Sequence, residues 1–307
     1  MSPARRVYRA ALRAVQRLVN ALGWNVALAA DYYSPLPLRS ELARHRARWD
    51  RPSELVGVRY DLDAMRSLDS RLFGEHGAEL RDLTSYDDAK RLGYGPGFTR
   101  LDAQWLYLML RHLKPARYVE VGSGLSTWYA SVAGARNATE GRPCKLAAID
   151  PYASEQVRGI AGLEVVREPV QSADLGPFLA LDAGDVLFID STHVVKIDGD
   201  VPHLYLEVLP RLRPGVVVHS HDVHFPYNTP HPAETYVLEA KWPRYWTEAM
   251  LLQAFLCGNE SWEILLSAGL LRHFDEDHLR ATVPDYRPLE IRDHDTHYGS
   301  IWYQRQK

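Results

Sequence analysis

The stretch Arg117-Tyr-Val-Glu-Val-Gly-Ser-Gly-Leu-Ser-Thr127 decides the fold. Its first five residues are rich in valine and tyrosine and predict a short strand. Gly122 and Gly124 follow at once and predict a tight turn, and a helical pattern then runs from about Ser126 to Ala133. A strand, a glycine turn and a helix are the first part of a βαβ unit. The stretch therefore predicts a parallel sheet with helices packed on it.

The same alternation continues along the chain and extends this sheet. A buried-face helix over 101–113, ended by Lys114-Pro115, precedes the first strand. Further strands of about five residues are separated by helical patterns, which indicates right-handed crossovers between parallel strands. The predicted strands are 117–121, 146–149, 163–167, 185–190, 215–218, 262–266 and 301–304, with helices near 200–212 and 246–256 in the second half.

Composition places the chain among globular proteins of one large α/β domain with an appendage. Of its 307 residues, 46% are hydrophobic and 24% charged, which excludes wholesale disorder. No apolar run approaches the roughly 20 residues of a membrane span. The net charge of −3 provides no general attraction for nucleic acid. We expect an N-terminal helix and a helical or irregular cap over 1–100, and the main domain over 101–307.

The chain contains only two cysteines, Cys144 and Cys257, which limits the disulfides and the metal sites that it can form. Two thiols form neither a disulfide framework nor a four-cysteine zinc site. The composition suits a reducing compartment, and we expect a cytoplasmic protein.

Residues 1–30 carry five arginines and no acid, and apolar residues recur there at helical spacing. The pattern predicts a basic amphipathic helix. We favour a helix docked on its own domain or on a second subunit, which would make a homo-oligomer. A membrane-surface contact and an organellar presequence remain alternatives. The segment lacks the apolar core and the cleavage site of a secretory signal.

The glycine turn after the first strand has the character of a ligand-binding loop. Glycines let the backbone approach a ligand closely, and the N-terminus of the next helix offers free N–H groups. A dinucleotide fingerprint needs a third glycine where this chain has Thr127. Glu120 would repel a pyrophosphate but suits a cationic ligand. Asp150 ends the second strand, where a carboxylate can accept both hydroxyls of a ribose. The loop therefore favours a nucleoside that carries an ammonium group and no phosphate.

Glu120, Gly122, Gly124 and Asp150 together resemble the cofactor site of class I S-adenosylmethionine-dependent methyltransferases. The resemblance covers about residues 101–307 and implies a Rossmann-like, seven-stranded, mostly parallel sheet with an antiparallel last pair. It departs from the family at the usual third glycine of the motif, which is Ser126 here. The cofactor-binding residues that it implies are Glu120, Gly122, Ser123, Gly124, Ser126, Thr127, Asp150 and Asp190.

A second constellation, Asp190-Ser-Thr-His193 and His219-Ser-His-Asp-Val-His224, follows two neighbouring strands. Open α/β sheets place their ligands at these strand ends. Methyl transfer to a hydroxyl needs a base, or a divalent cation that lowers the pKa of that hydroxyl.

The Asp190-x-x-His193 pattern is similar to metal-assisted sugar O-methyltransferases. That resemblance implies that Asp190 and Asp222 ligate a cation such as magnesium and that His193 is the base. His221 stands where that family has an acid. We therefore take it as a third candidate ligand and as a second candidate catalytic histidine, although hard cations favour oxygen ligands.

Aromatic residues provide candidates for the wall of an acceptor pocket. The loop Gly93-Tyr-Gly-Pro-Gly-Phe98 cannot hold a regular element and suits either a lid or a surface connection. A Tyr-Ser-Pro segment near residue 32 extends the resemblance to a large bacterial group of uncharacterised methyltransferases, which names no substrate. The candidates are Tyr94, Phe98, Tyr227 and Trp246, and ordinary packing in the core or cap is the alternative for each.

The sequence thus predicts an S-adenosylmethionine-dependent methyltransferase that acts on a small hydroxylated acceptor, a sugar or a natural product. A non-catalytic module that binds S-adenosylmethionine or a partner is the first alternative, since fold does not fix function. A non-haem metal oxygenase that uses the histidine-rich segment is the second. It would leave the Glu120 loop unexplained.

Overall fold

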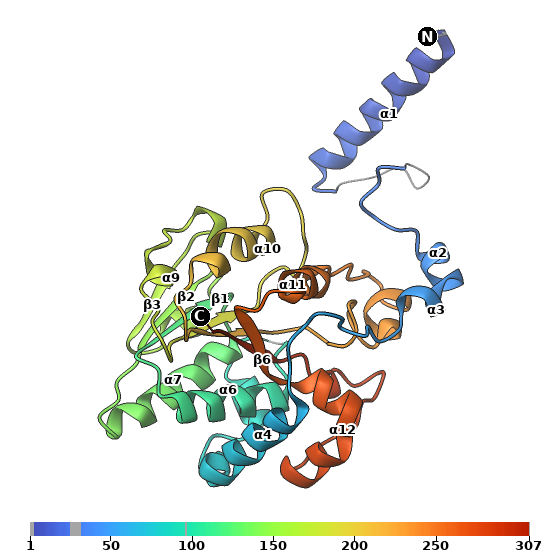
Figure 1. Cartoon of the computed structure of the whole chain (residues 1–307). Coiled ribbons are helices and arrows are strands. Elements are labelled where there is room, and N and C mark those ends of the chain that lie inside the picture. The colour runs from blue at the N-terminus through green and yellow to red at the C-terminus, as the bar shows by residue number, and fades with distance from the viewer. Residues whose placement is uncertain (1–2, 25–31, 96, 307) are drawn as a thin grey trace. The chain divides into compact units, whose positions relative to one another are not determined.

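The computed structural model describes residues 3–24, 32–95 and 97–306, and Figure 1 shows the chain. It forms two compact units, Met1–Arg48 and Trp49–Lys307. The first unit contains α1 (Pro3–Ala21) and α2 (Arg39–Arg44), and α3 (Arg46–Trp49) lies at the boundary. The predicted basic helix over 1–30 corresponds to α1, and residues 25–31 of that prediction lie outside the described residues.

The helix α1 is amphipathic, and most of its described apolar side chains are exposed. Val7, Tyr8, Val15 and Leu18 each expose more than half of their surface. Within the described residues, no helix has the length and apolar character that a membrane crossing requires.

The second unit is built on a seven-stranded sheet in the order β3-β2-β1-β4-β5-β7-β6. The first five strands along the chain run parallel to one another, and β7 pairs antiparallel with both β5 and β6. The Rossmann-like fold with an antiparallel last pair is therefore confirmed. The strands are β1 (Arg117–Val121), β2 (Lys145–Ile149), β3 (Leu163–Val166), β4 (Val186–Ile189), β5 (Val217–Ser220), β6 (Trp262–Ser267) and β7 (Ile301–Arg305).

Helices cover both faces of this sheet. In Figure 1, α6 and α7 (green) lie on one face and α10 and α11 on the other. The central strand β4 is buried at every position, as expected for a strand covered on both sides. The helices of this unit are α4 (Leu62–His76), α5 (Tyr86–Arg91), α6 (Arg100–Leu113), α7 (Leu125–Thr139), α8 (Glu155–Arg158), α9 (Gly176–Leu179), α10 (Asp200–His203), α11 (Glu248–Leu256) and α12 (Ala268–Thr282), and η3 (Leu204–Val208) continues α10 as a π-helix.

Residues 49–100 share the core of the second unit. The helix α4 packs against α6 and α12. Asp69 of α4 is fully buried, and it accepts hydrogen bonds from Trp105 Nε1 and His278 Nε2, both at 2.9 Å. A bridge between Tyr60 and Ile264 adds a contact to β6. These contacts join residues 49–100 to α6, which precedes β1, and to β6 and α12 in the last part of the chain.

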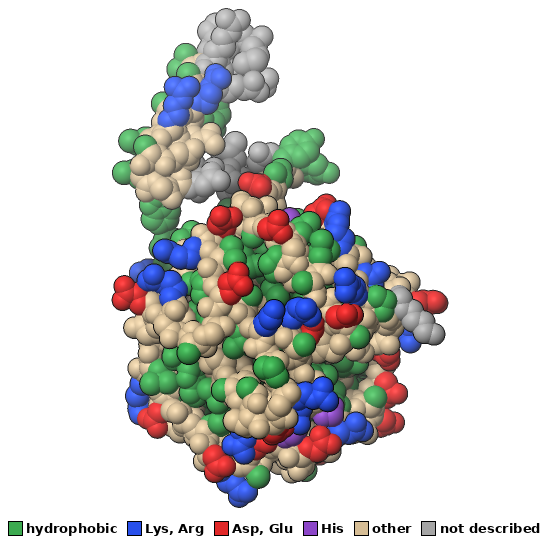
Figure 2. Space-filling model, turned by 90° about the vertical axis from the view of Figure 1, so that its left-hand side faces the viewer, with side chains coloured by type: hydrophobic (Ala, Val, Ile, Leu, Met, Phe, Trp, Pro, Cys, Tyr) green, Lys and Arg blue, Asp and Glu red, His purple; other side chains and the backbone are tan. Residues whose placement is uncertain are grey.

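The face of the molecule shown in Figure 2 is a mixed surface. Blue basic and red acidic side chains are interspersed over it, with small green apolar areas between them. Such interspersion is typical of a solvated surface.

Candidate functional site

A cleft opens at the carboxyl ends of β1, β2 and β4. Its volume is about 550 Å³, and it lies where the strand order reverses between β1 and β4. Open α/β sheets bind ligands at this switch point. Four of the eight predicted cofactor-binding residues line this cleft, namely Gly122, Ser123, Asp150 and Asp190. Tyr152 and Lys196 also line it.

Gly122 is required by the close approach of the backbone that follows β4. Its φ is +83°, and a Cβ there would lie 2.0 Å from the carbonyl oxygen of Asp190. A Cβ at Gly124 would lie 3.1 Å from the carbonyl oxygen of Tyr94. The first glycine thus lets the ends of β1 and β4 approach each other, and the second lets the backbone of Tyr94 approach the turn.

Glu120 is a fully buried carboxyl beneath this turn. The hydroxyl of Ser126 donates to its Oε1, and within the described residues its Oε2 has no hydrogen-bond partner. Burial raises the pKa of Glu120 to about 8. Ser126 replaces a glycine of the family motif, and it serves here as the donor that holds this carboxyl.

Asp150 follows the end of β2 and lines the cleft. Its Oδ1 accepts a hydrogen bond of 2.7 Å from the backbone N–H of Tyr152, and its Oδ2 accepts one from the hydroxyl of Ser123. These bonds fix the plane of the carboxylate. Asp150, which the sequence predicts to bind the ribose, therefore lies in the cleft, and hydrogen bonds from the chain orient both of its carboxylate oxygens.

The polar residues that follow β4 and β5 lie close together around His193. His193 is 5% exposed. Its Nε2 lies 3.2 Å from Asp190 Oδ1 and 3.6 Å from Asp222 Oδ2. Both His193 and Asp222 have positive φ, +60° and +58°, a conformation that costs free energy in residues other than glycine. Such backbone strain clusters at functional sites because the surrounding structure imposes it.

Glu248 completes this cluster, and sequence reasoning missed it. Its Oε2 lies 2.8 Å from His193 Nδ1, and its Oε1 accepts from the hydroxyl of Tyr205 at 2.9 Å. The backbone N–H groups of Thr247 and Glu248 donate to the carbonyl of His193. An acid in the first turn of a helix is ordinary dipole compensation, so the sequence alone did not distinguish it.

The carboxylates around His193 control its protonation. Burial favours the neutral imidazole, but Asp190 and Glu248 outweigh it and raise the pKa of His193 to about 10. In this arrangement His193 is protonated at neutral pH. A protonated imidazole cannot accept a proton, so the predicted role as base requires a change in the charge around it.

His221 lies on the other side of Asp190. Its Nδ1 is 3.5 Å from Asp190 Oδ2 and 3.9 Å from Asp222 Oδ1, and its Nε2 is 3.1 Å from Asp102 Oδ2. Asp102, in the first turn of α6, also accepts hydrogen bonds from Thr99 Oγ1 at 2.6 Å and from Ser300 N at 3.0 Å. Despite complete burial, these donors and His221 lower the pKa of Asp102 to about 2. In the sequence, Asp102 is recognisable only as a polar residue in an apolar helix.

One group of side chains has the geometry to hold a metal ion. Asp190, His193 and Asp222 each offer one ligand atom, and these three atoms lie within 4.8 Å of one another. Two carboxylates and an imidazole suit a divalent cation. The predicted set named His221 as the imidazole ligand, and its Nδ1 lacks a hydrogen-bond partner among the described residues. Both histidines therefore border the same carboxylate pair.

The structure separates the predicted acceptor residues into two kinds. The ring of Trp246 lies 4.7 Å from that of His193, and the ring of Phe98 lies 4.8 Å from that of His221. Tyr94 instead packs near Trp128, with 6.4 Å between ring centres. Tyr227 stacks on His231 at 3.7 Å. Trp246 and Phe98 border the His193 and His221 rings, whereas the contacts of the two tyrosines lie elsewhere.

Comparisons with known proteins find similarity over part of the chain. Residues 119–223 match the family model of a methyltransferase domain. An uncharacterised protein of Archaeoglobus fulgidus is 30% identical over 165 residues, which cover 49% of this chain and 72% of that protein.

Solved structures with a similar arrangement include three proteins of low identity. The O-methyltransferase TomG of Streptomyces achromogenes, in complex with SAM, is 16% identical and covers 81% of this chain and 92% of its own, with a TM-score of 0.39. An O-methyltransferase of Bacillus cereus in complex with SAH is 14% identical, with 80% and 100% covered and a TM-score of 0.41. Cofactor-bound Rv0187 from MTB is 18% identical, with 80% and 95% covered and a TM-score of 0.42.

Proposed function

This chain belongs to the class I S-adenosylmethionine-dependent methyltransferases, and we propose that it methylates a hydroxyl group of a small acceptor, a sugar or another hydroxylated metabolite. The acceptor oxygen forms a bond to the methyl carbon as the bond from that carbon to sulfur breaks. The hydroxyl proton leaves to a base, and S-adenosylhomocysteine is released. The observation that carries the proposal is the group of Asp190, His193 and Asp222 at the strand ends beside the cleft.

The cleft has side chains suited to each part of the cofactor. Asp150 would accept the ribose hydroxyls, because both of its oxygens are held at the wall of the cleft. Glu120 would face the positive charge of the cofactor, since its Oε2 has no partner among the described residues. A cavity of about 550 Å³ is of the size that small-ligand sites have.

Asp190 and Asp222 would hold a divalent cation, with magnesium the first candidate, and His193 beside them would remain available for the proton. The cation would lower the pKa of the acceptor hydroxyl and help to orient it. Glu248 holds Nδ1 of His193 at 2.8 Å, which keeps the opposite nitrogen directed at the two aspartates. The chain thus orients the His193 ring by its own contacts, without a bound cation.

His193 would accept the hydroxyl proton from a neutral state. A cation bound between Asp190 and Asp222 would offset the charge of these two carboxylates, which help to raise the pKa of His193, and the imidazole would then lose its proton more readily. Asp190 and Asp222 would therefore have two effects, because the same carboxylates would bind the cation and influence the protonation of His193.

The test is methyl transfer from labelled S-adenosylmethionine to a panel of sugars, glycosylated metabolites and phenols, with and without magnesium. His193→Ala should lower the rate by about 10²–10⁴, the range for a positioned base, and leave cofactor affinity nearly unchanged. His112→Ala is the matched control, because His112 lies on α6 and pairs with Glu75, outside the candidate site. A His193→Ala protein that turns over as fast as wild type contradicts the role of His193 as base.

A non-catalytic binding module is the second candidate. The closed pairing of His193 with Asp190 and Glu248 favours it, because a buried ion-pair network also serves structure alone. Cofactor binding without methyl transfer to any member of the panel, with magnesium present, would support this candidate over the enzyme.

A further inference from the structure

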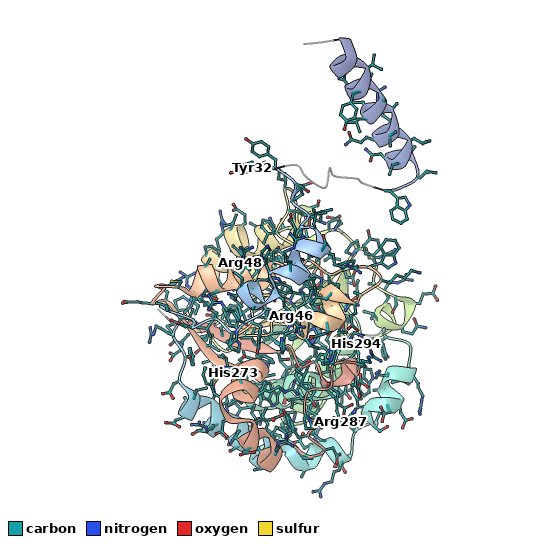
Figure 3. The ribbon with its side chains drawn as sticks, turned by 90° about the vertical axis from the view of Figure 1, so that its right-hand side faces the viewer. Tyr32, Arg46, Arg48, His273, Arg287 and His294 are labelled. Atoms are coloured by element: carbon teal, nitrogen blue, oxygen red, sulfur yellow. The ribbon has the colours of Figure 1, made fainter. Side chains whose placement is uncertain are left out.

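A second cavity lies apart from the cofactor cleft, beside α12. Its volume is about 340 Å³, and it is bordered by the 224–231 segment, by α12 and by the 288–298 segment. Figure 3 views the molecule from this side, with His273 of α12 and Arg287 and His294 of the following segment labelled. The polar side chains of the lining are His224, His231, Arg272, His273, Glu276 and His297.

Two histidines of this lining are short of hydrogen-bond partners. His224 is 5% exposed, and neither of its ring nitrogens has a partner among the described residues. Nδ1 of His231 also has none, and it lies 3.9 Å from the Oδ1 of Asp50. Buried polar groups in native proteins are almost always hydrogen-bonded. A ligand in the cavity would supply the missing partners.

The lining contains one guanidinium, that of Arg272. Among the described residues, no carboxylate lies within 4.0 Å of the Arg272 guanidinium. It donates to the Tyr286 hydroxyl and to the carbonyls of Thr296 and Arg287, which are neutral acceptors. Glu276, the acid of the lining, is already paired with Arg280 at 3.1 Å. The positive charge of Arg272 is therefore left without an anion.

Aromatic rings give the cavity a partly apolar wall. The Arg272 guanidinium lies 4.2 Å from the ring centre of Tyr298, and Tyr227 stacks on His231. Burial lowers the pKa of His231 to about 4, so this imidazole is neutral and offers one N–H donor. The carboxyls of Asp50 and Glu234 raise that pKa, and Arg272 and His297 lower it. A guanidinium charge, neutral donors and aromatic walls together match an organic anion.

We propose that this cavity binds a small organic oxyanion, a carboxylate or a phosphate ester, through Arg272, His224 and His231. The anion would pair with the guanidinium and accept the imidazole N–H groups, and its organic part would lie against Tyr227 and Tyr298. The site is separate from the cofactor cleft and does not depend on methyl transfer.

The test uses three probes of similar size: phenyl phosphate, benzoate and the neutral benzyl alcohol. Calorimetric titration of the full chain should show binding of one or both anions and no binding of the alcohol. The two anions distinguish a phosphate ester from a carboxylate. Arg272→Gln should weaken anion binding at least about tenfold, because a charge-assisted contact is lost. Arg213→Gln is the matched control, since Arg213 is an exposed guanidinium that bonds Asp182 outside the cavity.

Arg272 also holds three neighbouring groups, so its replacement can disturb the fold. His231→Gln is the second variant, because Nδ1 of His231 makes no hydrogen bond that the fold would lose. It should weaken anion binding several-fold while the melting temperature stays near that of wild type.

Three results would overturn the proposal. They are no binding of either anion at about 1 mM, equal binding of the alcohol, and unchanged anion affinity in folded Arg272→Gln and His231→Gln proteins. S-adenosylmethionine is titrated into the same preparations. Anion binding without cofactor binding would leave this site standing and contradict the proposed function. Cofactor binding without anion binding would do the reverse.

Discussion

Replacement of Glu120 by Gln tests whether this buried carboxyl meets the charge of the cofactor. Burial raises the pKa of Glu120 to about 8, so at pH 7 about 0.9 of the molecules carry the proton there. A sulfonium or ammonium group nearby favours the carboxylate and lowers that pKa. Binding of S-adenosylmethionine should therefore release up to about 0.9 proton per chain at pH 7. Because a proton leaves on binding, affinity should rise with pH and level off above about pH 8.

Calorimetry in two buffers measures this release directly. Phosphate has a small ionisation enthalpy and Tris a large one, so the difference between the observed heats gives the number of protons released. Wild type should show about 0.9 at pH 7, and Glu120→Gln should show nearly none, because the amide resembles the neutral acid in shape but does not ionise. Identical heats in both buffers for wild type, or the same release from Glu120→Gln, would refute the reasoning.

Three further expectations concern the frame and the metal group. Arg111→Met should lower the free energy of unfolding in urea by about 3–5 kcal/mol, because the buried guanidinium pairs with Glu79 at 2.8 Å. That pair lowers the pKa of Glu79 to about 2, so its contribution is present above pH 4.5 and should be lost in wild type as the pH falls from 4.5 to 2. Gly122→Ala should cost about 1–3 kcal/mol or more in the same assay, since its Cβ would meet the Asp190 carbonyl at 2.0 Å, and a wild-type unfolding curve would contradict that contact. Asp222→Asn, or a chelator added to wild type, should reduce turnover more than cofactor affinity, and turnover indifferent to chelator would remove the cation from the proposal.

The sheet was predictable because its signals are local. The 117–127 stretch combines a strand, a positive-φ glycine and a helix start, and the structure has β1, Gly122 and α7 there. The helix α4 was less visible. Its buried positions include Asp69, whose partners Trp105 and His278 come from distant parts of the chain. A buried acid breaks the apolar pattern that marks a helix in sequence.

The candidate site divides in the same way. Asp190, His193 and Asp222 were named together because they follow neighbouring strands, whose ends meet at one edge. Glu248 and Asp102 come from helices, and only the packing of those helices on the sheet brings them to His193 and His221. The protonation of His193 depends on that packing, so its pKa was not accessible from the sequence.

Equilibrium dialysis with labelled S-adenosylmethionine tests the central claim most directly. Wild type should bind the cofactor, and Asp150→Ala should bind it at least about tenfold more weakly, because a charge-assisted ribose contact of roughly 1.5–3 kcal/mol is lost. Glu164→Ala, which changes an exposed acid on the neighbouring β3, is the control and should bind like wild type. A folded wild-type protein that binds no S-adenosylmethionine, or an Asp150→Ala protein that binds it equally well, would contradict the account.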